Sequence, residues 1–458
     1  KPEPFIERYL RREVPERINY KGEIIQPIDK EYIKEIVDDF KNFGVEAIGI
    51  IFLHSYINPT HELEAKSMIK ELWPDVYITT SHEITRELRE YERTSTTVLN
   101  AYVKPIATNY LNRLQSKLDS ISVNRKYIMQ SNGGITTFDL AKDTPINMVE
   151  SGPVAGVYGA SILGEIIGEK NIIAFDIGGT TAKCSLIENG EVNVSTDYYI
   201  EKTDRSAGYP IKVPVVDIIE IGNGGGSIAW VDESKALKVG PQSAGAYPGP
   251  VAYNQGGKSP TTTDAHLVVG RLSPDNFDYD VNMSKVEKSI EENIAKPFNV
   301  SVHDAALGII RIANSNMLNA LKLISVRKGH DPRDFTLIAF GGGGSMHAPT
   351  LARELGVKKV VIPYASPVFS AWGMLMTDLR NDFVQTYIKR VEQIDFDEIN
   401  DQWNLLEENA LEQFATSGIR ESILFNYFVD MRYVGQEHTV KVPVSHGKWD
   451  EQTIDEIN

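Results

Sequence analysis

The sequence is poor in cysteine, in basic charge and in long apolar runs. Its 458 residues include one cysteine, Cys184, which excludes an internal disulfide and a cysteine-rich zinc site. Acidic residues outnumber basic ones by 63 to 47, and the net charge of −16 argues against unaided binding to nucleic acid or anionic lipid. No segment reaches the roughly 18 consecutive apolar residues of a membrane span. These absences favour a globular protein of the reducing cytoplasm.

Hydrophobic periodicity predicts alternating helices and strands at the start of the chain. Helical spacing covers 29–43 and 59–72, and short β-branched runs at 47–53 and 76–80 suit buried strands. This βαβ rhythm predicts a largely parallel sheet covered by helices. Further expected helices are 92–118, broken or kinked at Pro105, then 154–161, 284–295, 302–328, 348–355 and 395–417. Further expected strands are 127–129, 171–176, 182–187, 191–199, 211–219, 335–340, 359–362, 422–430 and 438–443.

The segment from Asp176 to Lys183 predicts a phosphate-binding hairpin. A carboxylate at a strand end is followed by Gly178 and Gly179, which let backbone N–H groups approach a phosphate without a Cβ in the way. Thr180 and Thr181 would add hydroxyl donors, Lys183 would add charge, and Asp176 would hold Mg²⁺ or its waters. A plain hairpin with a Gly-Gly turn is the alternative. Cys184 is expected to be a small buried side chain rather than a nucleophile.

Two further glycine clusters follow apolar strands. Both are expected to surround anionic oxygens with backbone amides, and the second also opens a helix whose N-terminus suits a phosphate or a nucleotide edge. Neither matches the Walker or the Rossmann spacing. The predicted nucleotide-binding residues in them are Gly224, Gly225, Gly226, Ser227, Gly341, Gly342, Gly343, Gly344 and Ser345.

Several titratable residues near these clusters are candidates for chemistry. Asp217 and Glu220 form one possible pair of Mg²⁺ ligand and general base. Residues three apart on a strand lie on opposite faces, so both can face one ligand only if a bulge intervenes. Asp264 and His266 suit catalysis or metal binding, and they suit a hydrogen-bonding role at the surface or in the core equally well. His347, one turn into the helix after the third cluster, suits nucleotide contact or simple capping equally well.

Several longer motifs make the chain similar to the hydantoinase A / 5-oxoprolinase family. They span nearly the whole sequence in order. The motifs are Ser81-His-Glu-Ile84, Tyr91-Glu-Arg-Thr-Ser-Thr-Thr-Val-Leu-Asn-Ala-Tyr-Val103, Gln130-Ser-Asn-Gly-Gly134, Glu150-Ser-Gly-Pro-Val-Ala-Gly156, Gly240-Pro-Gln-Ser-Ala-Gly-Ala-Tyr-Pro-Gly-Pro250 and Thr263-Asp-Ala-His266.

The resemblance implies an α/β protein with the actin-like ATPase fold of sugar kinases and the heat-shock chaperone, built from ribonuclease H-like subdomains. It implies ATP with Mg²⁺ or Mn²⁺ as cofactors. The implied reaction is phosphorylation of a carbonyl oxygen, which activates a cyclic amide or imide such as hydantoin, N-methylhydantoin or 5-oxoproline for ring opening. A B-type hydantoinase subunit and an oligomeric assembly are the implied partners. On this basis Asp176, Asp217 and Glu220 are the expected catalytic residues, and Asp176 and Asp217 the expected metal ligands.

The family comparison also predicts a divided and incomplete chain. Residues 1–95 would be the remainder of an N-terminal domain, 96–390 a two-lobed ATPase core, and 391–458 the start of a C-terminal domain. Family members usually carry an earlier glycine hairpin, so the chain is expected to be a fragment or a natural truncation. The rival functions are an ATP-binding subunit of an acetone or acetophenone carboxylase and a non-catalytic nucleotide-binding protein.

Overall fold

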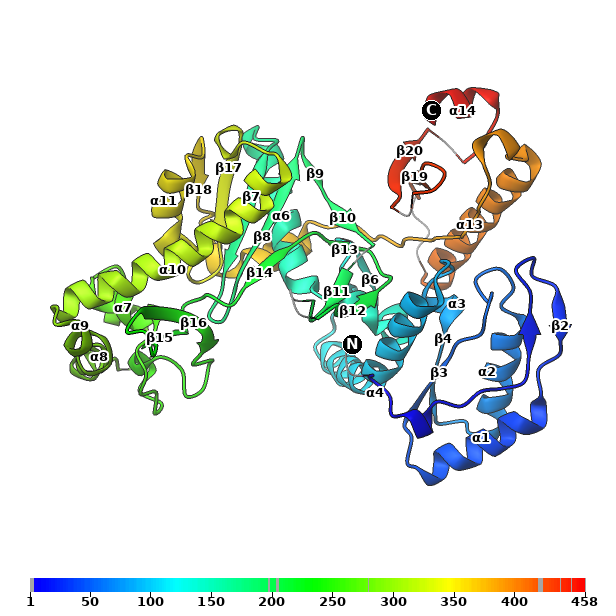
Figure 1. Cartoon of the computed structure of the whole chain (residues 1–458), viewed down its shortest axis with the longest axis horizontal. Coiled ribbons are helices and arrows are strands. Elements are labelled where there is room, and N and C mark those ends of the chain that lie inside the picture. The colour runs from blue at the N-terminus through cyan, green and yellow to red at the C-terminus, as the bar shows by residue number, and fades with distance from the viewer. Residues whose placement is uncertain are drawn as a thin grey trace.

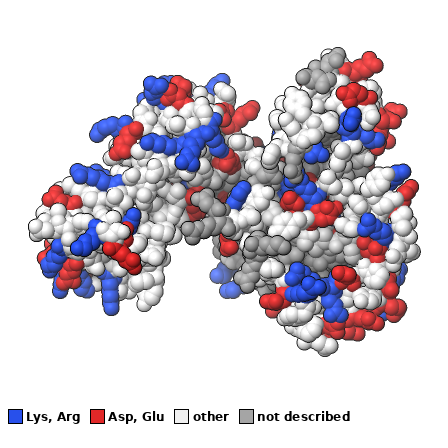
Figure 2. Space-filling view, viewed as in Figure 1, with Lys and Arg blue, Asp and Glu red and all other residues white. Residues whose placement is uncertain are grey.

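The computed structural model describes residues 4–196, 198–202, 206–278, 280–418, 423–436, 438–445 and 447–457. Figure 1 shows a central sheet with its helices at one end of the molecule and a smaller α/β unit at the other, next to the C-terminal helix and hairpin. Among the described residues, no helix combines the length and the apolar character that a bilayer span demands. On the face drawn in Figure 2, acidic and basic side chains are interspersed.

The N-terminal unit has the predicted βαβ form. Strands β3 (Ala47–Ile50) and β4 (Tyr77–Thr80) pair in parallel, and helices α1 (Lys30–Asn42) and α2 (Thr60–Leu72) pack with them around one apolar cluster. Asp29 caps α1 by accepting hydrogen bonds from two backbone N–H groups of its first turn, which fixes where the helix begins. The unit also contains β1 (Arg17–Ile18), β2 (Ile24–Gln26) and α3 (Ser81–Ile84).

Helix α4 (Glu90–Ser120) joins this unit to the rest of the chain and passes through Pro105 without ending. Of the predicted break or kink at Pro105, the break is therefore wrong, and the kink stays a prediction. Proline removes one backbone donor, and the packing of α4 against β3 and β4 outweighs that loss. After α4 come β5 (Tyr127–Met129), β6 (Ile135–Thr137), α5 (Phe138–Asp143) and α6 (Ser151–Ile167).

The central sheet is mixed rather than parallel. Its order is β14-β8-β7-β17-β18, with β9 added beside β8. The hairpin β7–β8 is antiparallel as predicted, whereas β17 runs parallel to both β7 and β18. The strands are β7 (Ile172–Ile177), β8 (Ala182–Glu188), β9 (Glu191–Val192), β14 (Ile219–Ile221), β17 (Thr336–Phe340) and β18 (Lys359–Val361).

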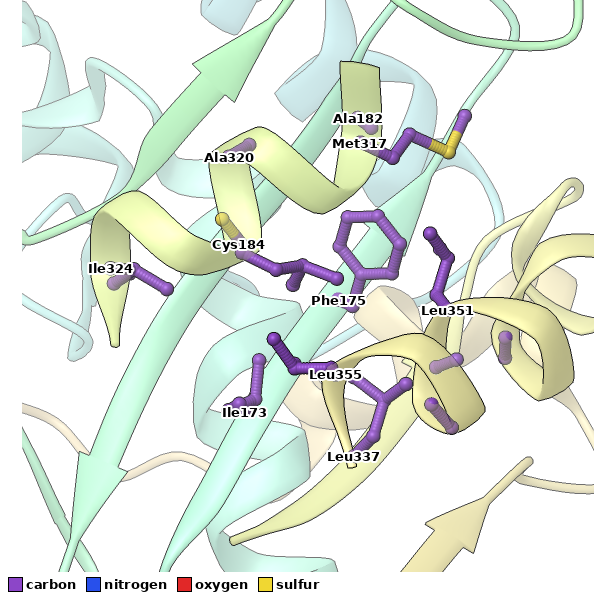
Figure 3. Packing of buried hydrophobic residues seen from close by; sticks show 14 of the residues in the cluster. Ile173, Phe175, Ala182, Cys184, Met317, Ala320, Ile324, Leu337, Leu351 and Leu355 are labelled. Carbon is purple, nitrogen blue, oxygen red and sulfur yellow. The ribbon is translucent and has the colours of Figure 1, made fainter. Parts of the chain in front are cut away.

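Both faces of this sheet are covered, which explains why its central strands β7 and β17 are mostly apolar. Ile173, Phe175 and Cys184 point to one face and pack under α10 (Val302–Ile324) and α11 (Gly344–Leu355), as Figure 3 shows. Ile172 and Ala174 point to the other face and pack under α6 and α12 (Phe369–Leu375). Burial raises the pKa of Cys184 to about 12, so the predicted role as a buried side chain is confirmed.

Short antiparallel pairs and helices surround the sheet. Hairpin β15 (Ser227–Val231) with β16 (Leu237–Ser243) was not predicted from the sequence. Its inner residues join α8 (Met283–Ile290) and α10 in a separate apolar cluster. These elements are β10 (Val194–Ser195) with β13 (Val215–Val216), β11 (Tyr198–Ile200) with β12 (Tyr209–Ile211), β15 (Ser227–Val231) with β16 (Leu237–Ser243), α7 (Thr262–Val268), α8 (Met283–Ile290), a π-helical turn (Glu291–Ala295) and α9 (Lys296–Phe298). Asp197 and Ser422, which two predicted strands included, lie outside the described residues.

An extended strap, residues 377–387, ties the sheet to the N-terminal unit. Gln130 donates to the carbonyl of Arg380, and Asn132 donates to the carboxylate of Asp382. Further along, the backbone N–H of Leu88 donates to the hydroxyl of Thr386. Beyond the strap, α13 (Phe396–Thr416), β19 (Tyr427–Met431), β20 (Val440–Val444) and α14 (Glu451–Ile457) form a small unit with its own apolar cluster.

Candidate nucleotide-binding site

The glycine hairpin lies at the end of the central strand of the sheet. Asp176 is the second-last residue of β7 and pairs across the hairpin with Lys183 on β8. Directly opposed residues of an antiparallel pair share one face, so the two side chains lie on the same side of the sheet. In the turn, the N–H of Gly178 donates to the carbonyl of Thr181 over 3.0 Å.

The second glycine loop, residues 222–227, packs against this turn. The N–H groups of Gly225 and Gly226 donate to the carbonyls of Gly178 and Gly179, over 3.0 Å and 2.6 Å. A Cβ on Gly224 would lie 2.6 Å from the carbonyl oxygen of Gly178, so only glycine permits this approach. The N–H of Gly224 is taken by the hydroxyl of Ser227. The amides of Gly225 and Gly226, which were expected to surround a phosphate, thus donate to the hairpin. Nucleotide contact by Gly224 to Ser227 stays a prediction.

The third loop, residues 341–345, meets the hairpin from the neighbouring strand β17. The N–H of Gly343 donates to the carbonyl of Ile177 over 2.9 Å. Gly341 has φ +78°, and a Cβ there would lie 2.3 Å from the Oδ1 atom of Asp176. Helix α11 begins at Gly344, so the N-terminus of this helix lies within the loop. The structure therefore brings all three predicted glycine clusters to one end of β7.

Free backbone donors gather at this meeting point. Within the described part of the chain, certain loop amides have no hydrogen-bond acceptor: those of Gly179, Thr180, Thr181, Gly342 and Ser345. The last two belong to the loop at the start of α11, where the helix dipole adds positive potential. Free N–H groups beside a helix N-terminus are the usual receptor for phosphate oxygens.

Charged side chains form a row across the same face of the sheet. Lys183 lies between Glu150 and Glu220, at 2.7 Å and 3.3 Å from its Nζ atom. Burial opposes the charged amine, but these two carboxylates raise the pKa of Lys183 above its ordinary value. Burial raises the pKa of Tyr198 to about 12, with help from the neighbouring Glu150. Lys183, predicted to face phosphate, is thus paired with glutamates in this structure.

Sequence reasoning missed Glu150 as a member of this row. Glu150 has φ 57° and ψ 13°, a left-handed conformation that is uncommon for a residue other than glycine and often marks a constrained site. It lies just before α6, where its position in the family motif is the only signal that singled it out.

Asp176 itself remains without a hydrogen-bond donor among the described residues. Burial raises its pKa above the ordinary value, and the nearby Lys183 charge opposes this. Asp217 lies on the opposite face, where it pairs with Lys328 of the segment after α10. As strand alternation predicts, Asp217 and Glu220 do not share a face, and Asp217 is not brought to Asp176.

The residues present fit a magnesium ion held through one carboxylate. In the described part of the chain, no three His, Cys, Asp or Glu side chains converge as a cage. Mg²⁺ rarely uses such a cage, because it keeps several waters and binds one or two carboxylates together with substrate phosphates. Asp176 fits that arrangement because its partly buried carboxylate has no donor among the described residues and lies next to Gly341 of the third loop.

The remaining candidates lie behind the loops. Asp264 is fully buried and accepts hydrogen bonds from the N–H groups of Val251, Ala252 and Thr261. Thr261 is the N-cap of α7, and Asp264 completes its capping box. The structure does not support a metal site formed by Asp264 and His266, because these hydrogen bonds occupy the carboxylate of Asp264. His266 instead faces His347 of α11, with 3.2 Å between their Nε2 atoms.

Two family profiles match the chain in sequence order. The profile of the hydantoinase/oxoprolinase N-terminal region matches residues 2–73, and the hydantoinase/oxoprolinase profile matches residues 93–383. The second match alone covers more than half of the chain. The chain belongs to the hydantoinase/oxoprolinase family.

Relatives of this hydantoinase/oxoprolinase chain include an uncharacterised protein of Methanocaldococcus jannaschii, 41% identical over 97% of this chain and 66% of the relative. Caprolactamase subunit alpha of Pseudomonas jessenii is 34% identical over 98% of this chain and 65% of the relative. The acetophenone carboxylase gamma subunit of Aromatoleum aromaticum is 34% identical over 95% of this chain and 61% of the relative. The chain thus spans slightly less than two thirds of the length of these relatives.

The fold agrees with a solved relative. The crystal structure of the ATP-dependent caprolactamase from Pseudomonas jessenii superposes on the whole of this chain and on 66% of that chain, with a TM-score of 0.85 and 34% identity. The mixed α/β architecture is therefore that of a hydantoinase/oxoprolinase family member.

Proposed function

We propose that this chain is the nucleotide-binding part of an ATP-dependent enzyme that opens the ring of a cyclic amide or imide. The observation that carries the proposal is the convergence of three glycine loops on Asp176, with free amides from two of them at its side. The sheet order β14-β8-β7-β17-β18, with an antiparallel hairpin followed by parallel strands, supports an actin-like ATPase core with ribonuclease H-like subdomains.

The chemistry explains why ATP is needed. An amide carbonyl is a poor electrophile, and transfer of the γ-phosphoryl group to its oxygen gives the carbon a good leaving group. The carbonyl oxygen attacks the γ-phosphorus and ADP leaves. A first water then adds to the carbon, and the C–N bond breaks as the nitrogen takes a proton, which leaves an acyl phosphate. A second water hydrolyses this acyl phosphate to the carboxylate and free phosphate. Overall, the lactam, ATP and two waters give the amino acid, ADP and phosphate.

The chain's own residues supply binding and orientation. The amides of Gly179, Thr180, Gly342 and Ser345 would hold phosphate oxygens. Asp176 would hold Mg²⁺ through oxygen or water, and the ion would neutralise charge on the β- and γ-phosphates. The row of charges at Lys183 would face the same phosphates. Glu220, exposed at the edge of this row, is the proposed general base.

A carboxylase subunit is the second candidate. It is favoured by one observation: the identity to the acetophenone carboxylase subunit equals the identity to caprolactamase, at 34%. Both relatives are subunits by name, which supports the proposal of a B-type or other partner subunit in an oligomeric assembly. We place this assembly in the cytoplasm, and we keep the domain boundaries at residues 95 and 390 as part of the proposal.

The test is ATP turnover by the full-length protein together with its partner subunit. We expect phosphate release to rise when hydantoin, N-methylhydantoin, 5-oxoproline or caprolactam is added. Turnover that needs bicarbonate together with acetone or acetophenone would select the carboxylase. Nucleotide binding without turnover on either panel would leave a non-catalytic nucleotide-binding protein and overturn the enzymatic proposal.

A further inference from the structure

Two histidines and an asparagine form a buried chain behind the glycine loops. The Nε2 atoms of His266 and His347 are 3.2 Å apart, and the Nδ1 atom of His347 is 2.6 Å from the Oδ1 atom of Asn314. The three residues come from α7, α11 and α10, and their exposed fractions are 0%, 1% and 4%. Three helices are thus joined by one line of polar contacts inside an apolar layer.

The contacts fix the protonation of both rings. Because Asn314 offers an oxygen, Nδ1 of His347 carries the proton and its Nε2 atom is an acceptor. His266 must then donate from Nε2, which leaves its Nδ1 atom as the buried nitrogen without a described partner. Burial lowers the pKa of both rings, with the charge of Arg271 acting in the same direction. Both histidines are therefore neutral at physiological pH.

The contacts among His266, His347 and Asn314 connect the helices that adjoin the second and third glycine loops. On one side, Thr263 of α7 donates from its N–H and its hydroxyl to the carbonyl of Gly225, whose own N–H donates to the hairpin. On the other side, α11 begins in the loop whose Gly343 donates to Ile177 of the same hairpin. His266 and His347 join the two helices behind the loops. Each loop is thus fixed twice, at the hairpin and at the histidine pair.

We propose that His266, His347 and Asn314 act as positioning residues that set the spacing of the two glycine loops flanking the nucleotide. The inference rests on the proposed function for the identity of the ligand, a nucleoside triphosphate. It goes beyond that function by assigning loop geometry to residues that cannot touch the ligand. Both rings are too buried to reach a substrate, and the carboxylate of Asp264 is occupied in the capping box of α7.

The experiment compares His266→Leu, His347→Leu and the double variant in the full-length protein. We expect the KM for ATP to rise about tenfold in each single variant, because each removes the same link, and the double variant to be no worse than either one. His266→Gln keeps an amide donor at a similar reach and should recover part of the loss. Melting temperature, measured alongside, reports the general cost of replacing a buried polar side chain.

His61→Leu is the matched control. His61 is as buried as His266, with 2% exposure, and contacts Glu16 over 2.7 Å in the N-terminal unit. It should lower the melting temperature by a similar amount and leave the KM for ATP within about twofold of the wild type. An equal KM change in His61→Leu would mean that the effect is general destabilisation, and it would overturn the positioning role.

A second measurement separates this inference from the proposed function. Hydrogen–deuterium exchange without nucleotide should quicken in peptides covering residues 222–227 and 341–345 in His266→Leu and His347→Leu, but not in His61→Leu. Unchanged exchange at both loops in folded variants would overturn the inference even if ATP is the ligand. If the wild type binds no nucleotide while the exchange changes as expected, the proposed function fails and the link between the loops stands.

Discussion

The carboxylates of Glu62 and Asp176 lie in opposite surroundings, because the first accepts several hydrogen bonds and the second accepts none from the described residues. In the N-terminal unit, Glu62 is fully buried and accepts hydrogen bonds from the N–H of Phe52, the hydroxyl of Ser81, and both the N–H and the ring of His82. Arg93, also fully buried, lies 3.8 Å from it. Beside the hairpin, Asp176 is partly buried and has no described donor.

The pKa shifts express this difference. Burial alone would raise the pKa of Glu62, but its hydrogen bonds lower it below the ordinary value. The pKa of Asp176 is raised by burial, and Lys183 opposes this only in part because it is shared with two glutamates. A buried carboxylate with every lone pair satisfied stabilises a fold, whereas one left without donors is available to a cation or a phosphate-bound metal.

The largest effect on stability is expected from a substitution of Glu62, whose carboxylate is fully hydrogen-bonded. Glu62→Gln removes the buried carboxylate 3.8 Å from Arg93, so the buried guanidinium loses its main counter-ion. We expect a loss of about 3–5 kcal/mol in the free energy of unfolding, measured by urea titration. The KM for ATP of the folded fraction should not change, and a selective loss of ATP turnover without destabilisation would contradict the comparison.

The next largest effect is expected on ATP turnover, from a substitution of Asp176, which has no hydrogen-bond donor among the described residues. Asp176→Asn should lower ATP turnover by about 100-fold or more, since it removes the anionic oxygen proposed to hold the metal ion. The melting temperature should stay constant or rise, because the variant removes a partly buried charge that has no described donor. Steady-state phosphate release and a thermal scan measure both. Retained turnover would move the metal site elsewhere.

The two carboxylates should respond to pH with opposite signs. The folded-state pKa of Glu62 lies below 4.5, so its stabilisation is present above that pH and is lost as the pH falls through the folded-state value. The folded-state pKa of Asp176 lies above 3.8, so the folded state is favoured below that pH and loses this advantage as the pH rises through the folded-state value.

Unfolding free energies between about pH 3 and 6 measure this contrast. The deficit of Glu62→Gln against the wild type should grow as the pH rises, whereas Asp176→Asn should gain on the wild type. Two differences that change in the same direction would contradict the assignment.

A smaller effect is expected from crowding the second loop. Gly224→Ala places a Cβ within 3 Å of three backbone atoms of Gly178 and Gly179, which must then move. We expect a loss of about 1–3 kcal/mol in stability and a several-fold rise in the KM for ATP. Gly152→Ala in α6 is the matched control, since its Cβ would meet no atom within 4 Å and Gly152 lies outside the three glycine loops. Equal KM values in the two variants would show that the loop spacing does not matter.

The smallest effect is expected at Asp217. Asp217→Asn weakens a half-exposed ion pair with Lys328 on the face away from the site, so ATP turnover should stay within about twofold of the wild type. A loss comparable to that of Asp176→Asn would place Asp217 in the reaction and restore the metal pair that the sequence suggested.

Local patterns predicted the local structure well. The helices and strands of the N-terminal unit and the hairpin β7–β8 lie within a few residues of their predicted bounds, because their periodicity and turn residues agree with the fold. The separation of Asp217 from Glu220 followed from strand alternation. The burial of Cys184 followed from its small apolar side chain and from the lack of a histidine close in sequence. The capping box of α7 had a readable signal as well, since Thr261 precedes Asp264 by three residues.

Non-local pairing was beyond the sequence. Nothing near Gly341 indicates that β17 runs beside β7, yet this pairing brings the third loop to Asp176. The same holds for the amides of Gly225 and Gly226, which were expected to face a ligand and instead face the hairpin. Free amides and occupied amides have the same sequence signature, so only the fold separates them.

The strap at residues 377–387 has a consequence for synthesis. Its contacts with Gln130 and Asn132 span 250 residues of sequence, and its contact with Leu88 spans 298. At about 5–20 residues per second, a ribosome takes roughly 10–60 s to deliver the strap after those partners have emerged. During that interval, Gln130, Asn132 and Leu88 of the nascent chain lack their hydrogen-bond partners in the strap. Chaperones therefore have a defined time in which to bind the unfinished chain.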